Sequence, residues 1–385
     1  MSEWKEYSLD EITAPIKETY FPNGSEDLNY IGLEHIEQGS LRINSIGKSA
    51  EVSSNKFIFK ANDVLFGKLR VYFRKVVKPN FEGICSTDIW VFRAKKGIDQ
   101  TFLFYFLANW DFVNLADGGE GGTRMPRADW NFLKTTKWQL PSLPEQKAIA
   151  SILSSLDDKI DLLHRQNATL EKLAETLFRQ WFVEEAKEEW EEGTLDEILT
   201  VKGGTTPSTA TKEYWDGNIH WTSPRDVTNL NGIFLFDTER KITEAGLRQI
   251  GSGLLPKGVL LMSSRAPVGV LAFAEIPVAI NQGYIAIIDD KGFSKEFIYL
   301  WLKENMETVQ SYANGSTFLE ISKSAFKTLQ ISKPPKKVLT DFQSQVQPFF
   351  EKIKTNQTQI RTLTTLRDTL LPKLMNGEIK VETKG

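Results

Sequence analysis

The feature of this sequence that most constrains its fold is an internal duplication. The stretch WKEYSLDEI at residues 4–12 returns as WEEGTLDEI at residues 190–198, 186 positions later, with six of nine residues identical. Residues 86–107 align without gaps on residues 281–302 at an offset of 195, and a third set of matches keeps an offset of 193. A chain that repeats one unit in this way is expected to fold as two similar domains.

Composition narrows the classes of protein to which the chain can belong. The 385 residues are 41% hydrophobic and 25% charged, which is typical of a globular protein of two or three domains. Basic and acidic residues number 47 and 50, so no global excess of positive charge indicates nucleic acid or a membrane surface as a partner. The single cysteine, Cys85, indicates a reducing compartment. With no signal sequence and no apolar run long enough to span a bilayer, we expect a cytoplasmic protein without a membrane partner.

Each half combines strand-like runs with a predicted amphipathic helix. Short β-type runs punctuated by glycine and proline occur at residues 56–60, 64–66, 89–92, 258–262, 268–274 and 284–288. Residues 101–115 and 295–312 are predicted to be matching helices, each followed by a loop that contains glycine. Both halves are therefore predicted to be mixed α and β domains.

A long apolar seam follows each of these domains. Positions with alternating steps of four and three are Ile149, Leu153, Leu156, Ile160, Leu163, Asn167, Leu170, Ala174, Leu177 and Trp181 in the first half, and Phe342, Val346, Phe349, Ile353, Asn356, Ile360, Leu363, Arg367, Leu370 and Leu374 in the second. This spacing predicts two coiled-coil helices that pair with each other, with polar residues in the seam to fix the register. Each helix would measure about 60 Å at about 1.5 Å per residue. The alternative is that both are ordinary core helices of one compact body.

Opposite charge also favours pairing of the two helices. Residues 143–190 carry ten acidic and six basic side chains, whereas residues 338–376 carry three acidic and five basic ones. Charges of opposite sign at positions that flank a seam favour association.

Sequence motifs for catalysis or cofactor binding are weak in this chain. The sequence Gly47-Lys48-Ser49 lacks the first glycine of a phosphate-binding loop, because Arg42 stands in its place. The histidines are dispersed, and none has the spacing of a metal ligand on a helix. We therefore predict no catalytic, cofactor-binding or metal-binding residue, although a pair of carboxylates with an acid and base role stays possible.

Loops rich in small, polar and basic residues form the candidate binding surface. Residues 118–124 and 314–317 combine glycine with hydroxyl or basic side chains, and residues 56–78 hold seven basic residues and one acid among aromatic residues. Such groups can bind phosphates or base edges, although a solvated surface can also carry them. The candidate DNA contacts are Lys68, Arg70, Arg74, Thr123, Arg124, Lys202, Thr205, Thr206, Ser208, Arg225, Ser263, Ser264, Arg265, Asn281, Gln282, Ser316 and Thr317.

Two stretches carry a resemblance to a known family. These are LPSLPEQ at residues 140–146, directly before the first seam, and KGGTTPS at residues 202–208, which leads to EYWDGNIHW at residues 213–221. With them the chain resembles, over essentially its full length, the specificity subunit of type I DNA restriction and modification systems. One departure is PPKKV at residues 334–338, where the first copy has its Pro-Glu-Gln sequence. Contacts of Glu145 and Gln146 therefore need no symmetric counterpart.

The resemblance implies an α+β fold with two mixed α/β target-recognition domains in a pseudo-twofold repeat, joined by two long helices in an antiparallel coiled coil. The expected boundaries are residues 1–140 and 187–333 for the recognition domains and residues 141–186 and 334–385 for the helical spacers.

The resemblance also implies a function for the chain. Each domain would read one half of a bipartite target in double-stranded DNA, with a spacer set by the helices. Catalysis would belong to two methyltransferase subunits, which use S-adenosylmethionine to modify adenine, and to nuclease and translocase subunits. Two alternatives stay open from the residues alone: a nucleic-acid-processing enzyme with an unrecognised carboxylate site, and a scaffold that binds only proteins.

Overall fold

The computed structural model describes residues 4–22, 24, 26–118, 126–265, 267–289, 291–315 and 319–381. By its internal contacts the chain divides into two compact units, and each is described by itself. Unit 1 comprises Met1–Leu162 and Ile360–Gly385, and unit 2 comprises Leu163–Gln359. This division assigns a part of each long helix to each unit, whereas the sequence boundaries separate helices from globular domains.

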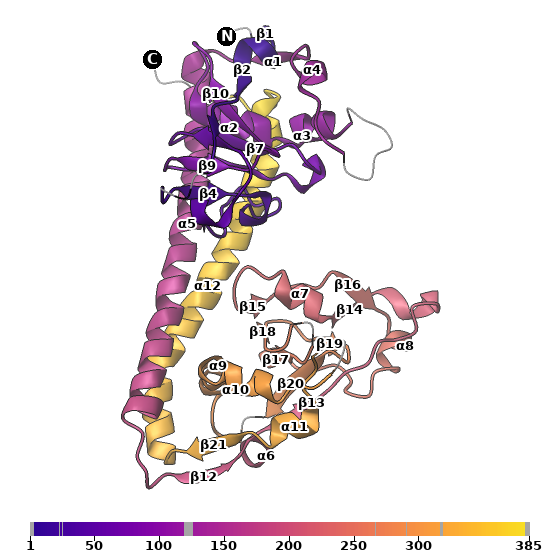
Figure 1. Cartoon of the computed structure of the whole chain (residues 1–385). Coiled ribbons are helices and arrows are strands. Elements are labelled where there is room, and N and C mark those ends of the chain that lie inside the picture. Colours follow the sequence, from indigo (N-terminus) through magenta and orange to yellow (C-terminus); the bar gives the residue numbers. More distant parts are fainter. Residues whose placement is uncertain are drawn as a thin grey trace. The chain divides into compact units, whose positions relative to one another are not determined.

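The described residues of unit 1 form three small sheets, with strand orders β1-β11, β2-β10-β7-β8 and β3-β6-β9-β4-β5 (Figure 1). Its strands are β1 Lys5–Ser8, β2 Thr13–Ile16, β3 Thr19–Tyr20, β4 Asn29–Ile31, β5 Gly47–Lys48, β6 Lys56–Phe59, β7 Val64–Gly67, β8 Val76–Val77, β9 Gly83–Cys85, β10 Ile89–Ala94 and β11 Lys137–Leu140. Its helices are α1 Leu9–Ile12, α2 Gln100–Ala108, α3 Trp110–Asp117, α4 Trp130–Leu133 and the first part of α5 Leu143–Arg179. The last part of α12 Lys336–Met375 completes the unit.

In unit 2 the part of the chain that the structure describes also forms three sheets, with strand orders β12-β21, β13-β20-β17-β18-β15 and β16-β14-β19. Its strands are β12 Glu191–Thr194, β13 Thr200–Lys202, β14 Trp215–Thr222, β15 Phe234–Leu235, β16 Arg240–Ile242, β17 Val259–Ser263, β18 Leu271–Ala274, β19 Ala279–Ile280, β20 Tyr284–Asp289 and β21 Gln330–Lys333. Its shorter helices are α6 Leu195–Ile198, α7 Pro224–Thr228, α8 Glu244–Leu247, α9 Lys295–Glu304, α10 Met306–Ser311 and α11 Lys323–Lys327. The remaining parts of α5 and α12 belong to this unit.

Matching hydrogen bonds in the two units confirm the duplication. Strand β1 pairs with β11 as β12 pairs with β21, and each pair is antiparallel. A capping box starts α1, where the backbone N–H of Ser8 donates to Glu11 at 2.7 Å, and an equivalent box starts α6, where Thr194 donates to Glu197 at 3.0 Å. Such a box satisfies amide groups that the first helical turn leaves unpaired. The repeated sequence WxExxLDEI is thus a repeated strand and helix start.

The helices predicted at residues 101–115 and 295–312 are each broken in two, which corrects the prediction of continuous helices. The backbone leaves the helical conformation at Asn109, with φ −66° and ψ 138°, between α2 and α3. The second break lies at Asn305, between α9 and α10, where the side-chain amide donates to the carbonyl of Trp301 at 2.9 Å. Asparagine side chains compete in this way with helical backbone bonds.

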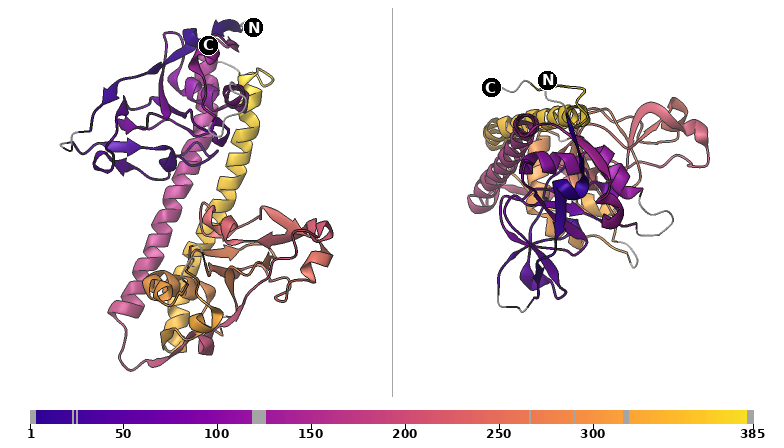
Figure 2. Two further views of the ribbon diagram at one scale, coloured as in Figure 1. Left: turned by 45° about the vertical axis from the view of Figure 1, so that its right-hand side comes forward. Right: turned by 90° about the horizontal axis from the view of Figure 1, so that it is seen from above.

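Within each unit, the segments of α5 and α12 pack against each other in antiparallel directions (Figures 1 and 2). In unit 2 the amide of Asn356 donates to Asn167 at 2.9 Å, and the rings of Phe178 and Phe342 lie 6.0 Å apart. In unit 1 the guanidinium of Arg367 binds Asp157 at 2.7 Å. All twenty predicted seam positions are buried or partly buried, which confirms the periodicity.

The main hydrophobic core of each unit includes this helix pair. In unit 1, Leu153 and Leu371 pack with side chains of α2 and of the sheet that holds β7 and β10. In unit 2, Val346 and Ile353 join a core with residues of α9 and β17. The globular part and the helices therefore share one core in each unit. The acidic side chains of α5 do not pair with α12 alone. Glu175 of α5 forms an ion pair with Lys303 of α9.

The buried Asn167–Asn356 pair generates a prediction about stability. Both side chains are below 10% exposed, and the Asn356 carbonyl oxygen has no partner among the described residues. We expect Asn356→Leu alone to lower the free energy of unfolding by about 1–3 kcal/mol, because it removes the donor to the side-chain oxygen of Asn167. The double variant Asn167→Leu with Asn356→Leu should regain this loss, as measured by equilibrium urea unfolding. A double variant less stable than the single one would contradict the role of the pair.

Candidate functional site

Several predicted contact residues of unit 2 lie on two adjoining loops. The loop at residues 203–208 follows β13 and packs against the turn between β19 and β20. The backbone N–H of Thr205 donates to the carbonyl of Ile280 at 3.1 Å, and the Thr206 hydroxyl donates to Gln282 Oε1 at 2.6 Å. A Cβ atom on Gly204 would lie 1.8 Å from the Ile280 oxygen, so only glycine permits this approach.

Other predicted residues of unit 2 are exposed around these loops. Lys202 and Ser208 stand at the two ends of the loop, where the Lys202 ammonium donates to the carbonyl of Ser252 at 3.3 Å. Arg225 on α7 is largely exposed and lies 3.6 Å from Glu239. Arg265 is partly exposed and forms a backbone bridge with Glu320.

Three predicted contacts in unit 2 are buried, and the structure corrects their assignment. The hydroxyl of Ser263 donates to the carbonyl of Pro267 and accepts from the backbone of Val270, so it closes the turn before β18. Because the turn extends to Val270, the strand predicted at residues 268–274 begins only at Leu271. Asn281 accepts a hydrogen bond from the backbone of Gly283 at 2.8 Å, and Ser264 is 3% exposed. The side chains of Ser263 and Asn281 support turns, and none of the three side chains is more than 8% exposed.

In unit 1, Lys68 and Arg70 follow β7, as Ser264 and Arg265 follow β17 in unit 2. The backbone N–H of Lys68 donates to the carbonyl of Asp88 at 2.9 Å, and that of Arg70 donates to Pro126 at 2.9 Å. Burial lowers the pKa of the Lys68 ammonium, and the carboxylate of Asp88 opposes this effect. Thr123, Arg124, Ser316 and Thr317 lie outside the described residues.

Arg74 is wrongly predicted as a surface contact. Its side chain is 2% exposed and donates to the carbonyl of Ala108 at 2.7 Å and to Asp368 of α12 at 3.2 Å. Burial lowers the pKa of its guanidinium, and Asp368 opposes this shift. Lys56 is also buried, and the Lys75 ammonium donates to a backbone carbonyl. The basic stretch at residues 56–78 is therefore partly structural, and it does not form one continuous surface.

Sequence reasoning missed Arg127 as a candidate. It forms an ion pair with Asp88 at 3.1 Å and keeps about half of its side chain exposed. Its backbone bridges Leu69, next to Lys68 and Arg70. The offset of 193 aligns Arg127 with Glu320, and no sequence motif marks either position.

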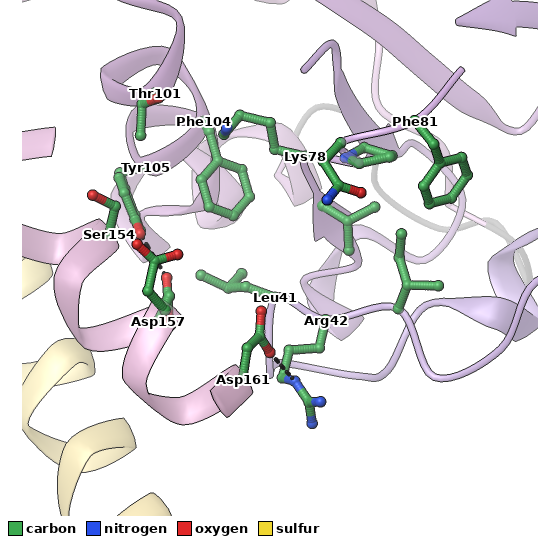
Figure 3. Close-up of a pocket in the computed structure, with 15 residues that line it drawn as sticks. Leu41, Arg42, Lys78, Phe81, Thr101, Phe104, Tyr105, Ser154, Asp157 and Asp161 are labelled. Carbon is green, nitrogen blue, oxygen red and sulfur yellow. Dashed lines mark hydrogen bonds and ion pairs between the residues drawn. The ribbon is translucent and has the colours of Figure 1, made fainter. Parts of the chain in front are cut away.

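Carboxylates also line a cavity of about 570 Å³ in unit 1, between the loops around Leu41 and Phe81 and the side of α5 (Figure 3). Asp157 accepts from Tyr105 at 2.6 Å and from Arg367 at 2.7 Å, and Arg42 binds Asp161 at 2.7 Å. Burial raises the pKa of Asp157, and Arg367 opposes this effect. One oxygen of Asp157 thus joins α2 to α5, and the other joins α5 to α12.

No group of three or more histidine, cysteine or acidic residues suited to a metal ion occurs in the described parts of the chain. No helix within the described ranges combines the length and apolar character that crossing a membrane requires.

The Asp157–Arg367 pair generates a second prediction. The Arg367 side chain is 1% exposed, and removal of one partner from a buried ion pair costs about 3–5 kcal/mol. We expect Asp157→Ala to destabilise unit 1 by about 3 kcal/mol, measured by urea unfolding with hydrogen exchange in α12. The neighbouring exposed Asp158 provides the control, since Asp158→Ala should change the stability little. Equal effects of the two substitutions would contradict a structural role of the pair.

Comparison with known proteins places this geometry in a family. The model of the type I restriction modification DNA specificity domain matches residues 1–172 and 187–365. The MjaIX specificity subunit of a type I restriction enzyme from Methanocaldococcus jannaschii is 36% identical over 162 residues, which cover 42% of this chain and 38% of that protein. The HindI specificity subunit from Haemophilus influenzae is 25% identical over an alignment of 464 positions, which covers 98% of this chain and 100% of that protein.

A solved structure agrees at the level of the fold. The type I restriction-modification S subunit from M. genitalium superposes with a TM-score of 0.56 at 18% identity, over 97% of this chain and 96% of that one. Because the family model matches both halves of the duplication and most of the chain, this protein belongs to the family of type I restriction modification DNA specificity domains and contains two copies of that domain.

Proposed function

We propose that this chain is the non-catalytic specificity subunit of a type I restriction-modification complex. Each unit reads one block of a bipartite sequence in double-stranded DNA, and α5 and α12 set a fixed spacer between the blocks. The observation that carries this proposal is the repetition of the same strand and loop arrangement in both units, with exposed polar and basic side chains beside β7 and β17. Two similar domains in one chain fit a target that consists of two blocks.

The proposal assigns the chemistry to partner subunits. Two methyltransferase subunits bind S-adenosylmethionine and modify adenine, and nuclease and translocase subunits complete the restriction complex. The modest net charge of −3 supports this division of labour, because partner subunits would supply many of the phosphate contacts. Methylation of a base in a duplex also requires that the base leave the stack. The two units would then hold the duplex while a partner opens it.

The direct test is selection from a pool of randomised duplexes by the complex of this chain with its methyltransferase subunits. We expect enrichment of two short blocks at a fixed separation, with an affinity that falls as salt rises. Enrichment of one block, or of none, would overturn the proposal. Methyl transfer or cleavage by the isolated chain would overturn its non-catalytic part.

A chimera tests whether reading is modular. Replacement of residues 187–333 with the matching segment of a relative should change the block that unit 2 reads and leave the other block unchanged, because the two units have separate cores. The measurement is the same duplex selection. A chimera that changes both blocks would contradict separate reading.

A point substitution tests the loop at residues 203–208. In Gly204→Ala the new methyl group would overlap the Ile280 oxygen, so the loop must move and take Thr205 and Thr206 with it. We expect preference at the block read by unit 2 to weaken about tenfold or more, since lost base contacts cost about 1–3 kcal/mol each. Gly251→Ala is the control, because no atom lies within 4 Å of its added Cβ. Equal behaviour of the two variants would show that this loop does not take part in reading.

A further inference from the structure

The two units share a set of backbone hydrogen bonds beside the candidate contact residues. We call this set of bonds the main-chain frame. The frame joins three places in each unit: the residue that follows β7 or β17, the turn before β10 or β20, and the segment before α4 or α11. In unit 1 the N–H of Lys68 donates to Asp88 at 2.9 Å, and its carbonyl accepts from Ala128 at 2.9 Å. In unit 2 the N–H of Ser264 donates to Gly283 at 2.8 Å, and its carbonyl accepts from Ile321 at 3.0 Å.

Further contacts of the main-chain frame also match between the units. Leu69 bridges Arg127 in unit 1, and Arg265 bridges Glu320 in unit 2. The turn before β10 is closed by a side chain, since the N–H of Asp88 donates to the Ser86 hydroxyl at 3.2 Å. The equivalent bond in unit 2 is the one from Gly283 to Asn281 described above. These hydrogen bonds and bridges therefore match in both frames.

The side chains on this common frame differ at every equivalent position. The pairs are Lys68 and Ser264, Leu69 and Arg265, Thr87 and Gln282, Asp88 and Gly283, and Arg127 and Glu320. By contrast, positions that build the units keep their residue type, as Leu9 and Leu195 or Phe102 and Phe297 do. Because the frame is held by main-chain bonds, the fold does not require these side chains to differ. The difference fits two readers of unlike sequences.

In each unit, one exposed side chain of the frame is oriented by a neighbour. In unit 1, two oxygens of Asp88 accept from Nε and Nη2 of Arg127, at 3.1 and 3.5 Å, and about half of the Arg127 side chain stays exposed. In unit 2, the Thr206 hydroxyl occupies one lone pair of Gln282 Oε1. The second lone pair and the amide N–H groups of Gln282 have no hydrogen-bond partner among the described residues. Arginine pairs with guanine and glutamine with adenine through two parallel hydrogen bonds in the major groove.

We propose that the main-chain frame holds the base-reading side chains of this protein. Arg127, oriented by Asp88, reads a guanine in the block of unit 1, and Gln282, oriented by Thr206, reads an adenine in the block of unit 2. This inference rests on the proposed function, and it adds Arg127 and the orienting roles of Asp88 and Thr206. Asp88 and Thr206 are positioning residues, which act through the readers.

The test uses the complete complex with methyltransferase subunits and duplexes randomised at both blocks. Arg127→Gln should lower the preference for guanine at one position of the first block about tenfold or more, and Gln282→Thr should do the same for adenine at one position of the second block. Each variant should leave the other block unchanged. Thr206→Val, which removes the hydroxyl and nearly keeps the side-chain volume, should lower the same adenine preference while non-specific binding persists.

Matched controls separate reading from general loss of charge or stability. Arg93 resembles Arg127 in being half exposed and bound to an aspartate, Asp63 at 2.7 Å, but it lies outside the frame. Gln249 is an exposed glutamine of unit 2 outside the frame. Arg93→Gln and Gln249→Thr should leave the preference for every base unchanged.

The outcomes distinguish the inference from the proposed function. If the unaltered complex selects no pair of blocks, the proposed function fails. If it selects two blocks and both frame variants select the same ones, the function stands and the frame inference is overturned. If Arg127→Gln abolishes binding altogether, Asp88→Ala decides, because it keeps the guanidinium charge and removes only its orientation. An unchanged guanine preference in Asp88→Ala would then overturn the inference.

Discussion

The structure depends on antiparallel packing between α5 and α12, because neither compact unit has a complete core without a segment of each helix. Unit 1 takes Leu371 and Leu374 from the end of the chain, more than 200 residues from its own sheets. Burial of such side chains contributes about 1.5–3 kcal/mol each. The polar pairs Asn167–Asn356 and Asp157–Arg367 fix the register of the two helices, because in this register their buried polar groups are bonded to each other. A one-turn slip would leave buried groups without partners.

Each unit thus takes a segment of both helices into its own core, and its loops are free to differ from those of the other unit. The main chain beside Lys68 and Ser264 is fixed by the same bonds in both units, so side chains there can change without loss of the fold. Loops held by a rigid scaffold are the usual place for recognition. In this chain the scaffold is the repeated frame, and divergence of its side chains is the chemical basis on which two copies can read different sequences.

Features with a local signal could be predicted from the sequence. The seam positions follow from a period of three and four residues, and the strand starts at β7, β10 and β20 follow from short β-branched and aromatic runs. The helix breaks at Asn109 and Asn305 were missed, because the apolar pattern continues through them. Asparagine in mid-helix is a weak signal on its own.

Features that depend on distant partners could not be predicted. Arg74 resembles a surface cation in sequence, since its partner Asp368 lies 294 residues further along the chain. The role of Gln146, which accepts from the N–H of Asp99 at the start of α2, has a counterpart in Gln343 beside Ser294 at the start of α9, although the two glutamines are not aligned by the repeat offset. Ser263 and Asn281 likewise acquire their structural roles only once the turns form.

We infer that one main-chain frame, used twice, presents different side chains to two blocks of DNA. The most direct measurement is a structure of the complete complex bound to a duplex that it has selected. We expect a guanine edge within hydrogen-bond distance of Arg127 in one block and an adenine edge within that distance of Gln282 in the other. Two frames that face protein or solvent, with base edges held by other parts of the chain, would contradict it.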